Sequence, residues 1–208
     1  MQIFGLTIAR TATLQKDLQS VDSSRGWFPL IREPFSGAWQ RNREETVDSV
    51  LAYGPVFACQ TLIASDVAKC RPRLVEQGAN GIWNEVERNS PFWPVLRKPN
   101  HYQNRIQFFE NWMLSKLSWG NTYALKARDA RGVVTALYIL DPQRVKPLVS
   151  DAGEILYRLS KDPLSRQTAD DVIVPAREVI HDRFNCLFHP LVGLSPLFAA
   201  TLSACVGL

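Results

Sequence analysis

Several patterns that are common in enzymes and membrane proteins are missing from this sequence. Its 208 residues contain no Gly-x-Gly-x-x-Gly, Walker or His-Glu-x-x-His pattern, so no nucleotide, dinucleotide or metalloprotease site is indicated. No run approaches the roughly 18 consecutive apolar residues of a membrane-spanning helix. The N-terminus also lacks the charged-then-apolar order of a secretory leader. These absences predict a soluble protein without a membrane span.

Strong charge and paired cysteines are missing as well. The net charge is +4, and the basic residues are dispersed instead of forming a tail. Such a balance permits contact with nucleic acid without indicating it. The cysteines form no Cys-x-x-Cys pair, which favours buried, reduced thiols in a cytosolic compartment. They are Cys59, Cys70, Cys186 and Cys205.

What is present predicts an α+β fold in which antiparallel β hairpins pack with two to three long helices. Residues 1–46 form an irregular N-terminal arm with a short strand near its start, because glycine and proline punctuate residues 17–49. Disordered segments are poor in aromatic residues, so the aromatics of this arm predict that it packs on its own core or on a neighbouring subunit. They are Trp27, Phe28, Phe35 and Trp39. Residues 47–208 form the α+β domain.

Helical periodicity predicts three helices in this domain. The first covers 55–69, begins with a proline, and has one apolar stripe that should face the core. The stripe consists of Val56, Cys59, Ile63, Val67 and Cys70. The second covers 104–119, where Asn104 and Gln107 have capping-box spacing. It is apolar on two faces, so we expect it to lie between two layers. The third covers 196–206.

The segments between these helices predict strands and turns. A glycine-rich hairpin is expected over 71–87, and a turn-like connector over the proline-rich residues 90–100. Residues 120–183 form a β unit in which Gly132 and Gly153 lie in hairpin turns. Its strands are expected at 122–128, 133–140, 144–149, 154–159, 172–174 and 178–183.

Three polar groups are candidates for chemistry, and a structural explanation fits each of them better. Ser195 precedes a proline, which is typical of a helix N-cap and not of a Gly-x-Ser-x-Gly nucleophile turn. His181, Cys186 and His189 lie close in sequence, but a fourth metal ligand is missing. Asp141 stands alone before a proline and suits a capped turn. The sequence thus predicts no catalytic, cofactor-binding or metal-binding residue, and no enzyme activity.

Five short motifs follow one another along the chain. The helical ones are Val56-Phe57-Ala58-Cys59 with Leu62-Ile63-Ala64, and Phe108-Phe109-Glu110 leading to Gly120-Asn121-Thr122-Tyr123-Ala124. The others are Leu137-Tyr138-Ile139-Leu140-Asp141-Pro142, Val179-Ile180-His181-Asp182-Arg183 and Gly193-Leu194-Ser195-Pro196-Leu197. Each is weak alone, but five in order over about 39–204 are a strong signal. Together they resemble the portal proteins of long-tailed double-stranded-DNA bacteriophages.

The resemblance implies a structural subunit of a ring, dodecameric in the full-length family, through which double-stranded DNA is packaged and ejected. Such a ring nucleates capsid assembly, joins head to tail, and contacts the major capsid protein, the terminase large subunit and head–tail connector proteins. It implies a place at the portal vertex of the virion, and in the host cytoplasm during assembly, with no membrane partner and no cofactor. The family's stem, clip and crown would follow Leu208 and are absent, so the chain corresponds to the N-terminal wing-like portion.

Two sets of residues follow as hypotheses. A channel for a polyanion should not hold phosphates tightly, which suits dispersed basic residues. The DNA-facing candidates are Lys126, Arg128, Arg144 and Lys146. A closed ring needs heterologous interfaces, and the candidates for this interface are the arm aromatics Trp27, Phe28, Phe35 and Trp39.

Three alternatives to a ring subunit stay open at the level of sequence. The chain could be a monomeric basic nucleic-acid-binding module, or a truncated prophage remnant without ring function. It could also be a cryptic hydrolase that uses Ser195 or His181. The mass of the native particle separates a ring from a monomer, and a steep salt dependence of DNA binding marks the basic module.

Overall fold

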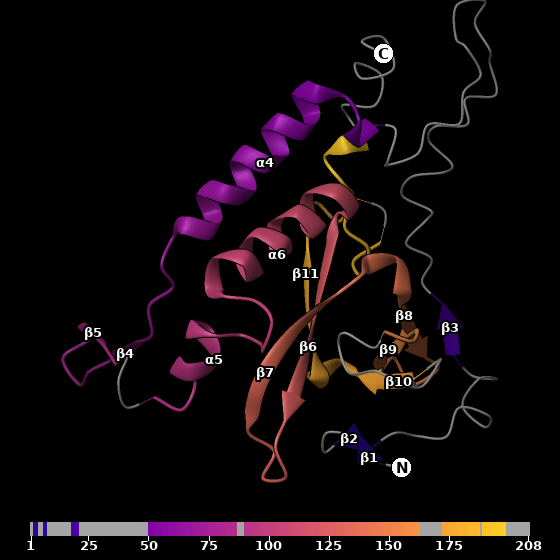
Figure 1. Cartoon of the computed structure of the whole chain (residues 1–208). Helices are drawn as coiled ribbons and strands as arrows, with labels where there is room; N and C mark the ends of the chain where they lie inside the picture. Colours follow the sequence, from indigo (N-terminus) through magenta and orange to yellow (C-terminus); the bar gives the residue numbers. More distant parts are fainter. Residues whose placement is uncertain are drawn as a thin grey trace, which may run out of the picture.

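The chain folds into stacked layers of helix and antiparallel sheet, as the computed structural model shows (Figure 1). The structure describes residues 2–3, 6–7, 18–20, 50–86, 90–162, 172–187 and 189–198. Helix α4 (Gly54–Lys69) packs on helix α6 (Arg105–Trp119), and α6 packs on a three-stranded sheet. A four-stranded sheet covers the other face of that sheet. The predicted α+β class is confirmed.

Both sheets are antiparallel throughout. The three-stranded sheet has the order β11-β6-β7, with β6 at Asn121–Arg128, β7 at Val134–Leu140 and β11 at Val179–Arg183. The four-stranded sheet has the order β10-β9-β8-β3, with β3 at Leu18–Ser20, β8 at Val145–Ser150, β9 at Ile155–Leu159 and β10 at Val172–Pro175. The turns at Gly132 and Gly153 have φ of 81°, the left-handed conformation that glycine adopts without strain.

The main core lies between the two sheets. Strand β6 is buried on both faces, because α6 covers one face and the four-stranded sheet covers the other. The hydroxyl of Thr122 donates to the carbonyl of Trp112 in α6 at 2.8 Å. The core residues between the sheets are Tyr123, Leu125, Ala127, Tyr138, Leu140, Val145, Tyr157, Leu159, Val172, Val174 and Val179.

Helix α6 has the limits that its sequence predicts. Asn104 Oδ1 accepts from the Gln107 amide at 2.9 Å, and Gln107 Oε1 accepts from the Asn104 amide at 3.0 Å, so the capping box is confirmed. The helix ends at Gly120, which has φ of 73°. The helix lies between α4 and β6, as expected, and Phe108 is 1% exposed, but Ile106 on the other predicted apolar face is 45% exposed.

Helix α4 occurs where it is predicted, but the predicted core stripe is wrong. Cys59, Ile63 and Val67 are exposed, and the buried face of the helix, which packs on α6, carries Gln60, Ala64 and Ala68 instead. Small residues let two helices approach closely, so the alanine face fits against α6 while larger apolar side chains point away. The expectation of buried thiols is also wrong, because Cys70 and Cys186, like Cys59, are exposed.

Two segments contain more structure than expected. Residues 90–100 include a short helix, α5 (Trp93–Arg97), because a proline in the first helical turn removes no helical hydrogen bond. Strand β3 lies in the span 17–49, which was expected to be irregular, and pairs with β8. Near the start of the arm, β1 (Gln2–Ile3) and β2 (Leu6–Thr7) pair with each other.

The remaining expectations concern the ends of the chain. The last predicted helix is seen at its start, at residues 197–198, and its continuation to 206 lies outside the described residues. The arm aromatics Trp27, Phe28, Phe35 and Trp39 also lie outside them. Among the helices that the structure describes, none has the length and apolar character needed to span a bilayer.

Candidate functional site

The four candidate DNA-facing residues differ in how freely their charges are presented. Lys126 Nζ donates to the carbonyl of Arg177 at 2.7 Å, and Arg144 Nη1 donates to the carbonyl of Lys161 at 2.9 Å. Lys146 is exposed on β8, and the described part of the chain gives it no partner. Whether any of them faces DNA stays a prediction, but Lys146 is the one whose charge is fully available.

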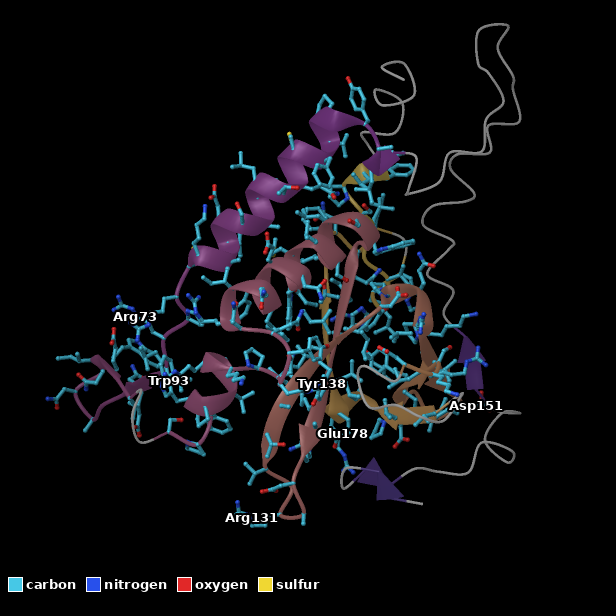
Figure 2. The ribbon with its side chains drawn as sticks, viewed as in Figure 1. Arg73, Trp93, Arg131, Tyr138, Asp151 and Glu178 are labelled. Carbon is cyan, nitrogen blue, oxygen red and sulfur yellow. The ribbon has the colours of Figure 1, made fainter. Side chains whose placement is uncertain are left out.

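Arg128 is the most committed of the four. Its Nε donates to Glu178 Oε2 at 2.8 Å, and its Nη1 donates to the carbonyl of Gly132 at 2.8 Å. Glu178 is 5% exposed, and Figure 2 shows it low in the body of the molecule, while Arg131 marks the tip of the β6–β7 hairpin. A buried carboxylate needs a cation, so Arg128 has a structural task before any contact with DNA.

His181 belongs to a buried polar network and not to a metal centre. Asn121 Oδ1 accepts from the Gly193 amide at 2.9 Å, which identifies this atom as the oxygen. His181 Nε2 lies 3.1 Å from the same oxygen, so Nε2 carries the proton. The other ring nitrogen, Nδ1, therefore accepts from the Tyr157 hydroxyl at 3.0 Å. The network joins β6, β9 and β11.

Burial also sets the charge of this histidine. It lowers the pKa of His181 to about 3, with the Arg183 guanidinium acting in the same direction and the Asp182 carboxylate opposing both. The ring is therefore neutral at pH 7. No cluster of three metal-ligating side chains exists in the described ranges, and the sequence neighbours Cys186 and His189 do not complete one with His181.

Asp182, next to this histidine, ties β11 to α6. Lys116 Nζ donates to its two oxygens at 2.8 and 3.0 Å, and Trp112 Nε1 donates to Oδ2 at 2.8 Å. Although burial raises the pKa of the Asp182 carboxyl, the hydrogen bonds from Lys116 and Trp112 and the Lys116 charge prevail, so this pKa is lower than usual. The carboxylate is thus a structural anion.

Ser195 acts as a cap, as its sequence context predicts. Its hydroxyl donates to the carbonyl of Leu117 at 2.7 Å and accepts from the amide of Leu197 at 3.1 Å. Ser195 is 5% exposed, so substrate has no open path to its hydroxyl. Asp141 likewise caps a short 3-10 helix by accepting from the Gln143 amide at 3.0 Å. Both contacts hold turns in place.

The surface feature that sequence reasoning missed is a set of large, exposed apolar side chains. On α4 these include Phe57 at 61% and Leu62 at 62% exposure. A second group lies around the hairpin of β4 (Val75–Gln77) and β5 (Trp83–Glu85), where Trp83 is 62% exposed. A tryptophan next to a Gly-x-x-Gly turn is the signal that could have indicated it. We take these two groups as candidate interaction surfaces, since exposed apolar patches mark such sites.

Comparison with known proteins decides which family carries these surfaces. A family model described as phage portal protein matches residues 55–205. The chain belongs to the phage portal protein family. The matched range begins within α4, includes α6 and the three-stranded sheet, and contains the whole four-stranded sheet apart from β3.

Individual relatives agree with this assignment. The portal protein of Enterobacteria phage HK97 is 31% identical over 160 residues, covering 76% of this chain and 35% of the relative. An uncharacterized protein of Rickettsia felis is 26% identical over 150 residues, covering 71% of this chain and 37% of the relative. The chain therefore spans about a third of the length of the curated relatives it matches.

Solved structures share the fold. The chain resembles a protein chain from the neck of an empty gene transfer agent particle computed with C6 symmetry. The TM-score is 0.62 and the sequence identity is 19%, and the match covers 78% of this chain and 44% of the neck chain. It also resembles one from the neck of the native particle computed with C12 symmetry, with a TM-score of 0.58 and 19% identity over 77% of this chain and 40% of that one.

Proposed function

We propose that this chain is a structural subunit of a phage portal ring through which double-stranded DNA is packaged and later ejected. The observation that carries the proposal is the family match over residues 55–205. The solved neck structures with C6 and C12 symmetry support a closed ring, dodecameric in the full-length family. In this role the chain acts by assembly and geometry, and not by catalysis.

The electrostatics of the described surface suit such a role. A protein that grips DNA through many phosphate contacts loses affinity steeply with salt and cannot let the duplex slide freely. Here Lys126 and Arg144 donate hydrogen bonds to backbone carbonyls elsewhere in the chain, and Arg128 donates to the Glu178 carboxylate. The net charge of +4 then attracts DNA without a row of tight clamps.

The remaining partners follow from the same proposal. The ring sits at the portal vertex of the virion, where it joins head to tail and nucleates the capsid. Its partners are the major capsid protein, the terminase large subunit and head–tail connector proteins, which it meets in the host cytoplasm during assembly. The wing-like portion supplied by this chain gives the subunit its outer shape.

The mass of the native particle tests the proposal. Size-exclusion chromatography with multi-angle light scattering of the purified chain, at several protein concentrations, should show a discrete species of many 23.5 kDa copies. A species of one copy at every concentration would overturn the ring. If that single copy also bound DNA with a steep salt dependence, the monomeric basic module would be the better explanation.

A further inference from the structure

The hairpin of β4 and β5 has no cover from the rest of the described chain. All six strand residues are exposed, and among the described strands the two pair only with each other. Figure 1 shows the hairpin projecting at the edge of the molecule, beyond α5. An isolated two-stranded hairpin is marginally stable in water, so an order that persists here calls for a partner surface.

The base of the hairpin is held firmly while its body is free. Arg73 forms an ion pair with Glu85 across the strands, and the Arg71 guanidinium lies 5.7 Å from the centre of the Trp93 ring at the start of α5. Figure 2 shows Arg73 and Trp93 on the same side of the molecule as the hairpin. Of these contacts, the one between Arg71 and Trp93 joins the segment before the hairpin to α5.

One face of the hairpin presents large exposed side chains. Gln77 pairs with Trp83 and Val75 pairs with Glu85, so these four side chains share a face, while Glu76 and Asn84 lie on the other. Trp83 is 62% and Val75 is 48% exposed. A tryptophan is among the side chains that most often dominate a protein interface when a pocket receives them.

A hollow of suitable size lies elsewhere on the same chain. It has a volume of about 620 Å³ and is formed by the end of β11 and the segment that follows, with Arg183, Cys186, Leu187 and His189 among its lining residues. Leu187 is 69% exposed there. In Figure 1 the hairpin projects to the left of α6, whereas the segment after β11 runs to its right.

We propose that the hairpin of one copy docks into this hollow on the next copy, with Trp83 as the anchor. The inference rests on the proposed ring, because a closed ring needs two different patches that meet head to tail. The two patches lie on different sides of the subunit, as such an interface requires.

The native thiol of Cys186 makes the contact measurable, since it is exposed and lines the hollow. Gln77→Cys places a second thiol beside Trp83, and Glu76→Cys places one on the opposite face as the matched control. A disulfide forms only when the two Cα atoms lie within about 7 Å. Oxidation with copper–phenanthroline should therefore give a ladder of covalent oligomers with Gln77→Cys, which Cys186→Ser abolishes, and no Cys186-dependent ladder with Glu76→Cys.

Trp83→Ala supplies a second measurement. We expect it to weaken association roughly 30-fold in light-scattering measurements over a range of protein concentrations, the effect of removing a hot-spot side chain. Val133→Ala, at a 40% exposed position near the β6–β7 turn, should leave association unchanged. Because both side chains are exposed, the far-UV circular dichroism spectrum of each variant should match that of the wild type.

The outcomes separate this inference from the ring itself. A particle of many copies whose Gln77→Cys variant gives no Cys186-dependent ladder overturns the hairpin contact and leaves the ring standing. Wild-type association that persists unchanged in Trp83→Ala does the same. A single copy at all concentrations overturns the ring, and the hairpin contact with it.

Discussion

The close contact between Gly120 and Gly193 allows two costs of replacing a glycine to be measured separately: the cost of a left-handed backbone conformation and the cost of a steric overlap. A Cβ atom on Gly120 would lie 2.3 Å from the carbonyl oxygen of Gly193, and one on Gly193 would lie 2.0 Å from that of Gly120. Gly120 also has φ of 73°. Gly132 has φ of 81° with nothing within 4 Å of the added atom, so it isolates the conformational cost.

The three alanine substitutions should therefore form a graded series in the free energy of unfolding. Gly132→Ala should lose about 1 kcal/mol, the cost of a left-handed conformation with a side chain. The φ of Gly193 lies outside the left-handed region, so Gly193→Ala should lose about 3 kcal/mol, because rigid backbone must move to relieve the overlap. Gly120→Ala carries both penalties and should lose about 4 kcal/mol.

Urea unfolding followed by tryptophan fluorescence measures the series, with far-UV circular dichroism as the second probe. For a chain of this size each kcal/mol corresponds to a shift of about 2–4 °C in the unfolding temperature. Equal losses for Gly120→Ala and Gly132→Ala would show that the end of α6 does not pack against the segment before Ser195, and the account of this junction would be wrong. In the double variant the losses should not add, since each glycine is the other's obstacle.

Three further predictions concern charged and polar side chains. The pKa of His181 is about 3 in the folded protein and near 6.5 in the unfolded chain, so the unfolded chain binds the proton first as the pH drops. The free energy of unfolding should therefore fall between pH 6.5 and pH 4.5, by at most about 1.4 kcal/mol per pH unit. In urea titrations, His181→Phe should reduce this dependence on pH. Arg128→Met should cost about 2–4 kcal/mol in urea unfolding, because the buried Glu178 carboxylate loses its hydrogen bond and ion pair with Arg128. Lys146→Met is the matched control and should change the free energy of unfolding by less than about 0.5 kcal/mol. If Lys146 faces DNA, this variant should also reduce the slope of log affinity for DNA against log salt concentration by about 1. Trp112→Phe should lose about 1–2 kcal/mol through the missing bond to the Asp182 carboxylate, and an unchanged urea midpoint would contradict that role.

Local chemistry explains which parts of the fold the sequence could predict. The capping box of Asn104 and Gln107 is a contact between near neighbours, so its spacing alone defines the start of α6. The turns at Gly132 and Gly153 need a left-handed residue, and glycine marks both. Ser195 before a proline likewise indicates a cap. In each case the partners lie within a few residues, and no knowledge of the tertiary structure is required.

Contacts between distant residues explain what the sequence could not predict. The Asn121–His181–Tyr157 network joins three strands, and the sequence around any one of these residues does not indicate the other two. The commitment of Arg128 to Glu178 spans 50 residues, so the charge of Arg128 looked free. Strand β3 was missed because its pairing with β8 depends on a sheet edge formed far along the chain.

The wrong prediction for the buried face of α4 bears most directly on function. Helix α4 carries apolar residues on more than one side, so periodicity could not identify the face that meets its own core. The alanine face packs on α6 and leaves Phe57 and Leu62 exposed, just as the hairpin leaves Trp83 exposed. In a protein that works alone, selection would favour polar residues at such positions, because exposed apolar patches promote aggregation. Large side chains on two separate exposed faces are instead what a subunit needs when its neighbours complete its core.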